Sequence, residues 1–271
     1  MDRYVVIGNP VSHSLSPAIH AHFAEQSGEA IDYGTLLVPP GRFMFHAQQF
    51  FAAGGKGANV TLPFKVNAFH WADKRTERAE VAEAANFLML RSGVIEADNT
   101  DGAGLVADLA GNLKMDIAAS RILLVGAGGA ARGVIAPLLA QRPRRLVLAN
   151  RTAARAIELA GRFATMGAIE AVALDAIPGE DFDLVLNATS SSTHGETLAL
   201  PARAMRAGSF AYDMAYGPAA RPFLARAGAS GMRTSDGLGM LVEQAAESFQ
   251  LWRGRRPATA RILAELRSRL A

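Results

Sequence analysis

Short apolar runs alternate along the chain with longer stretches in which apolar residues recur at helical spacing. This alternation predicts an α/β fold, in which helices connect the strands of largely parallel sheets. The predicted strands cover residues 4–7, 31–38, 58–61, 86–91, 94–97, 122–125, 146–149, 169–174, 183–186, 209–214 and 231–235. In the first half, helices are predicted from Ser16 to near Gly28, from Phe43 to Ala53, from Pro63 onward, and from about Asp101 through Leu109. In the second half, they are predicted from the glycine-rich turn to about Gln141, around Arg151–Arg155, after Gly237, and from Pro257 to Leu270.

The strand at 122–125 is followed by a glycine-rich turn, a helix and the strand at 146–149. The turn has the Gly-x-Gly-x-x-Ala spacing of a dinucleotide-binding βαβ unit. Gly126 permits the tight turn, Gly128 lets the backbone approach a pyrophosphate, and Ala131 lets the helix pack closely. A turn kept only for packing is the alternative, but the register of all four elements favours a dinucleotide. The candidate cofactor residues of this turn are Gly126, Ala127, Gly128, Gly129 and Ala130.

The end of the second strand indicates which dinucleotide is bound. An NAD site usually carries an acidic residue there, whereas this chain has Asn150, Arg151 and Thr152, with Arg155 four residues after Arg151. On a helix, positions 151 and 155 share a face, so two guanidinium groups and a hydroxyl are available to a 2′-phosphate. A solvated basic helix start is the alternative. Positive charge is unfavourable in a first helical turn, and NADP is therefore the expected cofactor.

Composition and charge narrow the function further. The 271 residues are enough for two ordinary domains. The formal net charge is only +3, and no run of basic residues contains interleaved aromatic residues, so a nucleic-acid role has little support. The absence of cysteine excludes disulfides, thiolate catalysis and cysteine zinc sites, and the six histidines are scattered, so no metal is expected. No apolar run is long enough for a membrane helix and no signal peptide is visible, which makes a cytoplasmic location the default.

Several polar residues of the first hundred stand next to predicted helix starts or strand ends. Ser14 and Ser16 lie beside a helix start, where Ser16 is the predicted N-cap and the two hydroxyls together could bind a carboxylate. Lys65 falls in a first helical turn, where the helix dipole disfavours a cation, so it is either a tolerated surface lysine or a group placed to move a proton. Asn59 and Thr61 point the same way from one strand.

Other polar residues have an ordinary structural reading as well as a functional one. Asn86 precedes an apolar strand, and Asp101 is most simply the N-cap of the helix that follows. In the second half, polar residues follow the carboxyl ends of strands, where ligands of parallel sheets collect. These candidates are Asn187, Thr189, Met214 and Tyr216, and Gly237 and Gln244 follow on the last apolar stretch.

Taken together, the motifs resemble the shikimate dehydrogenase family across nearly the whole chain. The resemblance rests on Ser14-Leu15-Ser16-Pro17, Asn59-Val60-Thr61-Leu62-Pro63-Phe64-Lys65, Asn99-Thr100-Asp101-Gly102, Gly126–Gly129 with Asn150-Arg151-Thr152, and Gly237-Leu238-Gly239-Met240-Leu241 with Gln244. It implies an N-terminal α/β substrate domain over 1–101, a doubly wound Rossmann domain for NADP over 102–236, and C-terminal helices over 237–271 that return to the first domain.

The resemblance also implies the reaction, which is the interconversion of 3-dehydroshikimate and shikimate with NADP(H). Lys65 is then the proton donor and acceptor, with Asp101 as its partner. Ser14 and Ser16 would bind the substrate carboxylate. The substrate hydroxyls would be bound by Asn59, Thr61, Asn86, Asp101 and Gln244, with Tyr216 nearby. The cofactor set, besides the glycine turn, is Asn150, Arg151, Thr152, Arg155, Thr189, Met214 and Gly237.

Two positions depart from the family pattern. Phe87 stands where the family usually has threonine, which could change the hydrogen bonding around the substrate and the preference between shikimate and quinate. Gly217 stands where asparagine is common, and glycine tolerates the same turn. The alternatives are a broader quinate/shikimate dehydrogenase that uses NAD, and a non-catalytic NADP-binding sensor. A homodimer is a possible assembly, and neither nucleic acid nor membrane is an expected partner.

Overall fold

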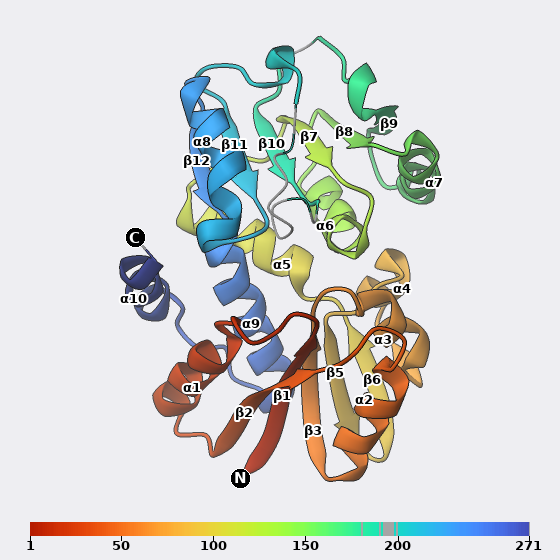
Figure 1. The fold of residues 1–271 in the computed structure, drawn as a ribbon, viewed down its shortest axis with the longest axis vertical. Helices are drawn as coiled ribbons and strands as arrows, with labels where there is room; N and C mark the ends of the chain where they lie inside the picture. Colours follow the sequence, from red (N-terminus) through yellow and green to blue (C-terminus); the bar gives the residue numbers. More distant parts are fainter. Residues whose placement is uncertain (180, 190, 192–197, 199, 271) are drawn as a thin grey trace. The chain divides into compact units, whose positions relative to one another are not determined.

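The computed structural model describes the chain except residues 180, 190, 192–197, 199 and 271. The chain divides into two compact units. Unit 1 contains Met1–Gly104 and Leu241–Arg269, and unit 2 contains Leu105–Met240 and Leu270. Each unit has its own sheet, and the predicted α/β fold is confirmed (Figure 1).

The sheet of unit 1 is mixed, with strand order β2-β1-β3-β5-β6-β4. Its strands are β1 (Asp2–Gly8), β2 (Ile31–Leu37), β3 (Gly55–Val60), β4 (Lys74–Arg75), β5 (Phe87–Arg91) and β6 (Val94–Asp98). Strand β5 runs antiparallel to β3 and also to β6, with which it forms a hairpin. Its predicted two-residue turn, Ser92-Gly93, has φ values of 51° and 79°, as a tight hairpin turn requires.

Helices cover both faces of this sheet. They are α1 (Ser16–Ser27), α2 (Phe43–Ala52), α3 (Lys65–Trp71), α4 (Glu77–Ala82) and α10 (Ala260–Leu270), with most of α9 (Leu238–Arg253). On one face, Ala58 and Val60 of β3 pack in an apolar core with Phe43 of α2. The opposite face carries Tyr33 and Asn59. Side chains therefore alternate along β3 between an apolar core and a polar environment, as strand geometry dictates.

The sheet of unit 2 is parallel throughout, with strand order β12-β11-β10-β7-β8-β9. Its strands are β7 (Arg121–Val125), β8 (Arg145–Asn150), β9 (Ile169–Ala173), β10 (Leu184–Asn187), β11 (Phe210–Asp213) and β12 (Arg233–Asp236). Its helices are α6 (Gly129–Ala140), α7 (Ala153–Phe163) and α8 (Arg221–Ala229), with 3-10 turns η2 (Leu174–Ala176), η4 (Ala202–Ala204) and η5 (Gly217–Ala220). The order reverses beside β7, which is where doubly wound sheets bind dinucleotides.

Two helices contain the boundaries between the units. Helix α5 (Asp101–Val106) continues as the π-helix η1 (Ala107–Asn112), and the unit boundary falls at Gly104/Leu105. The second boundary falls inside α9, at Met240/Leu241.

Two predictions about helix starts were wrong, and two elements were not predicted. Ser16 is the first residue of α1 and not its N-cap, because Leu15 already has helical backbone angles, φ −84° and ψ −6°. Helix α3 begins at Lys65, two residues after Pro63. Strand β4 and helix α4 were not predicted, although Thr76 accepts a hydrogen bond from the backbone N–H of Ala79 and is a regular N-cap.

Candidate active site

Lys65 and Asp101 form an ion pair in unit 1, beyond the carboxyl ends of strands β3 and β6. Lys65 follows β3, and Asp101 follows β6. Asn86 precedes β5, which runs antiparallel to both, so all three residues lie at the same end of these strands. Lys65 Nζ lies 2.5 Å from Asp101 Oδ2, and the two side chains are 14% and 5% exposed. Asp101 Oδ1 accepts a further hydrogen bond from Asn86 Nδ2 at 2.9 Å. The carboxylate is therefore held from two sides, while part of the ammonium stays accessible.

The orientation of the Asn86 amide follows from its neighbours. Its Oδ1 accepts a hydrogen bond from the backbone N–H of Thr100 at 2.7 Å, so Nδ2 must face Asp101. Nδ2 also lies 2.9 Å from Thr100 Oγ1 and 3.1 Å from Gln244 Oε1, which gives its two hydrogens three nearby acceptors. Asp101 is the first residue of α5 and not its predicted N-cap, and its backbone N–H donates to Asn99 Oδ1 at 3.1 Å.

Helix α9 contributes two polar residues one turn apart. Gln244 Nε2 donates to the carbonyl oxygen of Leu241 at 2.8 Å, which directs Oε1 toward Asn86. Ser248 is fully buried and lies 3.2 Å from Thr100 Oγ1. The sequence predicted Gln244 but missed Ser248 and Thr100. The local signal for Ser248 is its four-residue spacing from Gln244 on one helix face, and Thr100 stood only within the Asn99–Gly102 motif.

Asn59 lies in the same polar cluster and is 5% exposed. Its Oδ1 accepts from the Tyr33 hydroxyl at 2.8 Å, and its Nδ2 donates to the Asn86 carbonyl oxygen at 3.2 Å and to Ser248 Oγ at 2.9 Å. Thr61 is two residues further along and half-buried, on the side of the chain that faces Gly8. Asn59 is thus engaged within the protein.

The two predicted carboxylate-binding serines are adjacent. Ser14 Oγ accepts a hydrogen bond from the backbone N–H of Ser16 at 3.3 Å, and Ser16 is 4% exposed. This contact fixes the turn into α1 and brings both hydroxyls to the start of that helix. Their predicted role in carboxylate binding stays a prediction.

A histidine that the sequence did not single out lies next to the polar cluster. The ring of His20 stacks on Tyr33 with a centroid separation of 4.1 Å and an interplanar angle of 9°. Burial lowers the pKa of His20 to about 3 and raises the pKa of Tyr33 well above its usual value. His20 is therefore neutral at neutral pH, and within the described residues neither ring nitrogen has a hydrogen-bond partner.

Phe87, the departure noted in the sequence, is a core residue. It is 2% exposed, and its ring stacks on Trp252 with a centroid separation of 5.1 Å. The neighbouring Asn86 keeps its contacts with Thr100 and Asp101. The hydrogen bonding predicted for Asn86 is thus compatible with phenylalanine at position 87.

In unit 2 the glycine-rich turn lies between β7 and α6 as predicted. Gly126 has φ of 117°, and a Cβ there would lie 2.9 Å from the Ala188 carbonyl oxygen, so only glycine fits. Gly128 is the N-cap of α6, and a Cβ there would meet no described atom within 4 Å. Packing within the chain does not explain glycine at 128, which fits a backbone that an external group approaches. Ala127, Gly129 and Ala130 complete the turn.

The predicted 2′-phosphate residues follow β8. Asn150 Nδ2 donates to the carbonyl oxygen of Thr152 at 2.9 Å, and Thr152 is the N-cap of α7. Arg151 thus precedes the helix, and the prediction that it shares a helix face with Arg155 was wrong. Both arginines are exposed, and neither forms an ion pair within the described part of the chain. Exposed cations that form no ion pair within the described residues suit a phosphate, so Arg151 and Arg155 fit NADP.

The ends of β10 and β11 are joined by buried side chains. Asn187 Nδ2 donates to Asp213 Oδ2 at 2.9 Å, and Thr189 Oγ1 donates to Asn187 Oδ1 at 2.7 Å. Met214 and Tyr216 are half-buried after β11. A Cβ at Gly237 would lie 2.4 Å from the Met214 carbonyl oxygen, so glycine is required there, and Gly217 has φ of 63°, which suits its predicted turn. The predicted residues of these strand ends thus lie within one unit.

Other kinds of site receive no support from the described residues. No group of three or more His, Asp or Glu side chains among them could hold a metal ion, and His194 lies outside the described range. None of the described helices is both long and apolar enough to cross a membrane.

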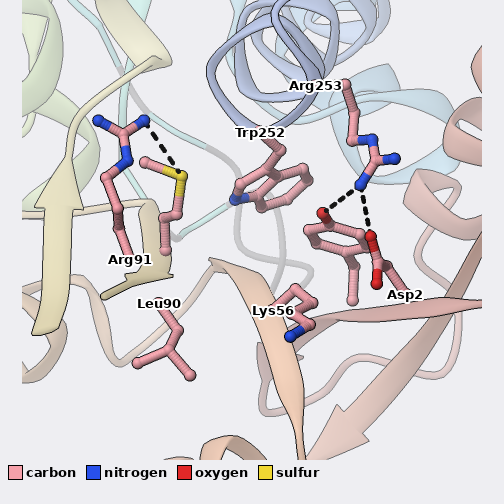
Figure 2. A pocket seen from close by; sticks show the side chains of 8 residues that line it. Asp2, Lys56, Leu90, Arg91, Trp252 and Arg253 are labelled. Carbon is pink, nitrogen blue, oxygen red and sulfur yellow. Dashed lines mark hydrogen bonds and ion pairs between the residues drawn. The ribbon is translucent and has the colours of Figure 1, made fainter. Parts of the chain in front are cut away.

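A groove of about 250 Å³ lies in unit 1 near the starts of strands β1 and β3, at the end opposite to Lys65 (Figure 2). Its lining includes Asp2 and Lys56 near the starts of β1 and β3, and Trp252 near the end of α9. Arg253 donates to Asp2 Oδ2 at 2.6 Å at its rim. Because β1 and β3 run from the groove toward Lys65, the groove is separate from the Lys65–Asp101 ion pair.

Models of three families match the chain. Residues 6–88 match the shikimate dehydrogenase substrate binding domain, residues 108–215 match shikimate / quinate 5-dehydrogenase, and residues 237–267 match the shikimate 5'-dehydrogenase C-terminal domain. A protein of Cupriavidus necator named shikimate dehydrogenase (NADP(+)) is 53% identical over 99% of this chain and 94% of its own. The chain belongs to the shikimate dehydrogenase family.

Solved structures of similar proteins cover this family member from end to end. The Ael1 enzyme from Pseudomonas putida is 44% identical, with a TM-score of 0.89 over 98% of both chains. The shikimate 5-dehydrogenase of Thermus thermophilus, in complex with NADP(H) and shikimate, is 30% identical, with a TM-score of 0.85 over 99% of both chains. The predicted family is thereby confirmed.

Proposed function

We propose that this protein is an NADP-dependent shikimate dehydrogenase, an oxidoreductase that interconverts 3-dehydroshikimate and shikimate in the shikimate pathway to aromatic amino acids. The observation that carries the proposal is the Lys65–Asp101 pair, at 2.5 Å, next to the Asn86 amide. A ketone and alcohol pair requires one proton at the reacting oxygen, and a partly exposed ammonium held by a carboxylate can supply it. The relatives named as NADP-dependent shikimate dehydrogenases support the same reaction.

Lys65 would act as the proton donor and acceptor. In reduction its ammonium gives a proton to the oxygen of the former ketone, and in oxidation its neutral amine takes the hydroxyl proton. Asp101 holds Lys65 Nζ through Oδ2, so the ammonium is directed before the substrate arrives. NADP, when bound, supplies the hydride acceptor, and NADPH the hydride donor.

The remaining residues of unit 1 would bind the substrate. Ser14 and Ser16 suit its carboxylate because both serines lie at a helix start, where Ser14 Oγ accepts from the backbone N–H of Ser16. Thr61, Asn86 and Gln244 are proposed for the hydroxyls. Tyr216 belongs to unit 2, and its substrate contact stays a prediction.

Unit 1 is accordingly proposed as the substrate domain and unit 2 as the NADP domain. In unit 2 the glycine turn would accept the pyrophosphate, and Asn150, Arg151, Thr152 and Arg155 the 2′-phosphate. Thr189, Met214 and Gly237 would line the nicotinamide side. The homodimer and the cytoplasmic location considered from the sequence stay predictions, and sedimentation velocity would check the first.

The test is the initial rate of NADPH formation from shikimate and NADP, with quinate and NAD as paired comparisons. Activity confined to shikimate and NADP is the expected result. Comparable rates with quinate or NAD would place the enzyme in the broader quinate/shikimate group. Binding of NADPH without turnover of either substrate would contradict the enzymatic proposal and favour a sensor.

A further inference from the structure

We infer that Asn59 is a positioning residue that holds Asn86, and through it the Lys65–Asp101 pair, and that it does not bind the substrate. The inference rests on the proposed function and assigns to Asn59 a role different from the one that family resemblance implied. It is carried by the bonds of the Asn59 amide, which reach Asn86 by two separate routes.

The Asn59 amide has no N–H left for a ligand. A carboxamide has two N–H hydrogens, and these are used by the Asn86 carbonyl oxygen at 3.2 Å and by Ser248 Oγ at 2.9 Å. The oxygen accepts from Tyr33 at 2.8 Å. With 5% of its surface exposed, Asn59 has its amide engaged by three groups of the protein itself.

The first route runs through the backbone of Asn86. Its carbonyl oxygen accepts from Asn59 Nδ2 and from the backbone N–H of Val60 at 2.8 Å. Its own N–H donates to the carbonyl oxygen of Asp98 at 3.2 Å. Hydrogen bonds thus fix both the carbonyl oxygen and the N–H of Asn86. The side chain of the same residue donates to Asp101.

The second route runs through Ser248 and Thr100. The Ser248 hydroxyl donates to the Gln244 carbonyl oxygen at 2.9 Å, so its lone pairs are free to accept from Asn59 and from Thr100. Thr100 in turn fixes the Asn86 amide through its backbone N–H at 2.7 Å. Ser248 and Thr100 are both fully buried, so no bulk water can replace a lost partner.

Loss of Asn59 should therefore change the rate of the reaction more than the binding of substrate. A small displacement of a catalytic group reduces the rate strongly, whereas a lost substrate contact raises KM. The two roles predict different kinetic changes for the same substitution.

The experiment compares Asn59→Leu, Ser248→Ala and the double variant. Leucine has a similar shape to asparagine and lacks its donors. Ser27→Ala is the matched control, because Ser27 Oγ donates to the carbonyl oxygen four residues earlier in α1, at 2.6 Å, as Ser248 does in α9. We expect kcat to fall about tenfold in Asn59→Leu and about threefold in Ser248→Ala, with KM for shikimate within about twofold and the control unchanged. The loss of kcat in the double variant should be smaller than the product of the two single losses, because both substitutions remove the Asn59–Ser248 bond.

A second measurement does not depend on turnover. In protein with 15N-labelled asparagine, the side-chain NH2 signals of Asn86 should shift in Asn59→Leu and in Ser248→Ala, and stay in place in Ser27→Ala. This readout also covers the case in which Asn59→Leu folds poorly, because Ser248→Ala removes only one hydroxyl.

A raised KM with unchanged kcat, additive effects in the double variant, or unshifted Asn86 signals would overturn the inference. A wild-type protein that does not oxidise shikimate would instead overturn the proposed function, and the Asn86 signals would still decide the role of Asn59.

Discussion

The two units place their candidate residues in contrasting ways. In unit 1 the polar side chains bond to one another: Lys65 to Asp101, Asp101 to Asn86, and Asn86 to Thr100. In unit 2, by contrast, the backbone of Gly128 has open space beside it, and Arg151 and Arg155 are exposed. Proton transfer needs a group held within a fraction of an ångström, whereas a phosphate needs only charge and free N–H groups. The difference teaches that the reacting groups are fixed before binding, while Gly128, Arg151 and Arg155 are left available to a ligand.

The largest effect is expected at the centre of the bonded cluster. Lys65→Ala should lower kcat by about 10²–10⁴-fold, because proton transfer by a positioned group contributes that much, and KM should change far less. Initial rates with shikimate and NADP measure this. Lys56→Ala is the control, because Lys56 is an exposed lysine of the same sheet. A variant of Lys65 with wild-type kcat would remove this lysine from the mechanism.

The glycines of the turn separate packing from ligand binding. Gly126→Ala should lower stability by roughly 2–5 kcal/mol, since it combines a positive φ of 117° with a Cβ 2.9 Å from a carbonyl oxygen. Gly128→Ala should keep its stability, because its Cβ meets nothing described in the chain, and it should weaken NADP binding. Urea unfolding and calorimetric titration measure the two quantities. If Gly128→Ala binds NADP normally, the backbone at 128 does not approach the pyrophosphate.

Arg151 tests the exposed charges of unit 2. Arg151→Ala should weaken NADP binding by about 10–100-fold and NAD binding little, because a hydrogen bond to a charged group is worth about 1.5–3 kcal/mol. Arg162→Ala, at the far end of α7 where Arg162 pairs with Glu158, is the matched control. Equal losses for both dinucleotides would show that Arg151 does not contact the 2′-phosphate.

The sequence predicted much of unit 2 and only part of the bonded cluster in unit 1. Apolar runs such as 122–125 and the glycine spacing are local signals, so the strands and the turn could be found without tertiary information. Helix α4 also carried a local signal, because Thr76 caps it and Glu77 and Glu80 lie in its first turn. The Asn59–Ser248 bond joins residues 189 positions apart, and no local pattern predicts which distant polar groups become buried together.

The smallest effect concerns His20, which lies beside the bonded cluster without belonging to it. Burial lowers the pKa of His20 to about 3, against an ordinary value of 6.5 in the unfolded chain, so the folded state favours the neutral ring. The unfolding free energy keeps the contribution of the neutral ring in full above pH 6.5. It loses this contribution as the pH falls from 6.5 toward 3, by about 1.4 kcal/mol per pH unit.

His20→Phe should remove that loss. Phenylalanine keeps an aromatic ring for stacking on Tyr33 and does not titrate. Between pH 7 and about pH 5.5 the wild type should therefore lose roughly 1.4 kcal/mol more of its unfolding free energy than the variant does. Urea unfolding at a series of pH values measures the difference, with His70→Phe, at an exposed position of α3, as the control. Parallel curves for wild type and His20→Phe would mean that His20 finds a partner for its proton in the folded protein, and that the bonded cluster extends one residue further than its hydrogen bonds show.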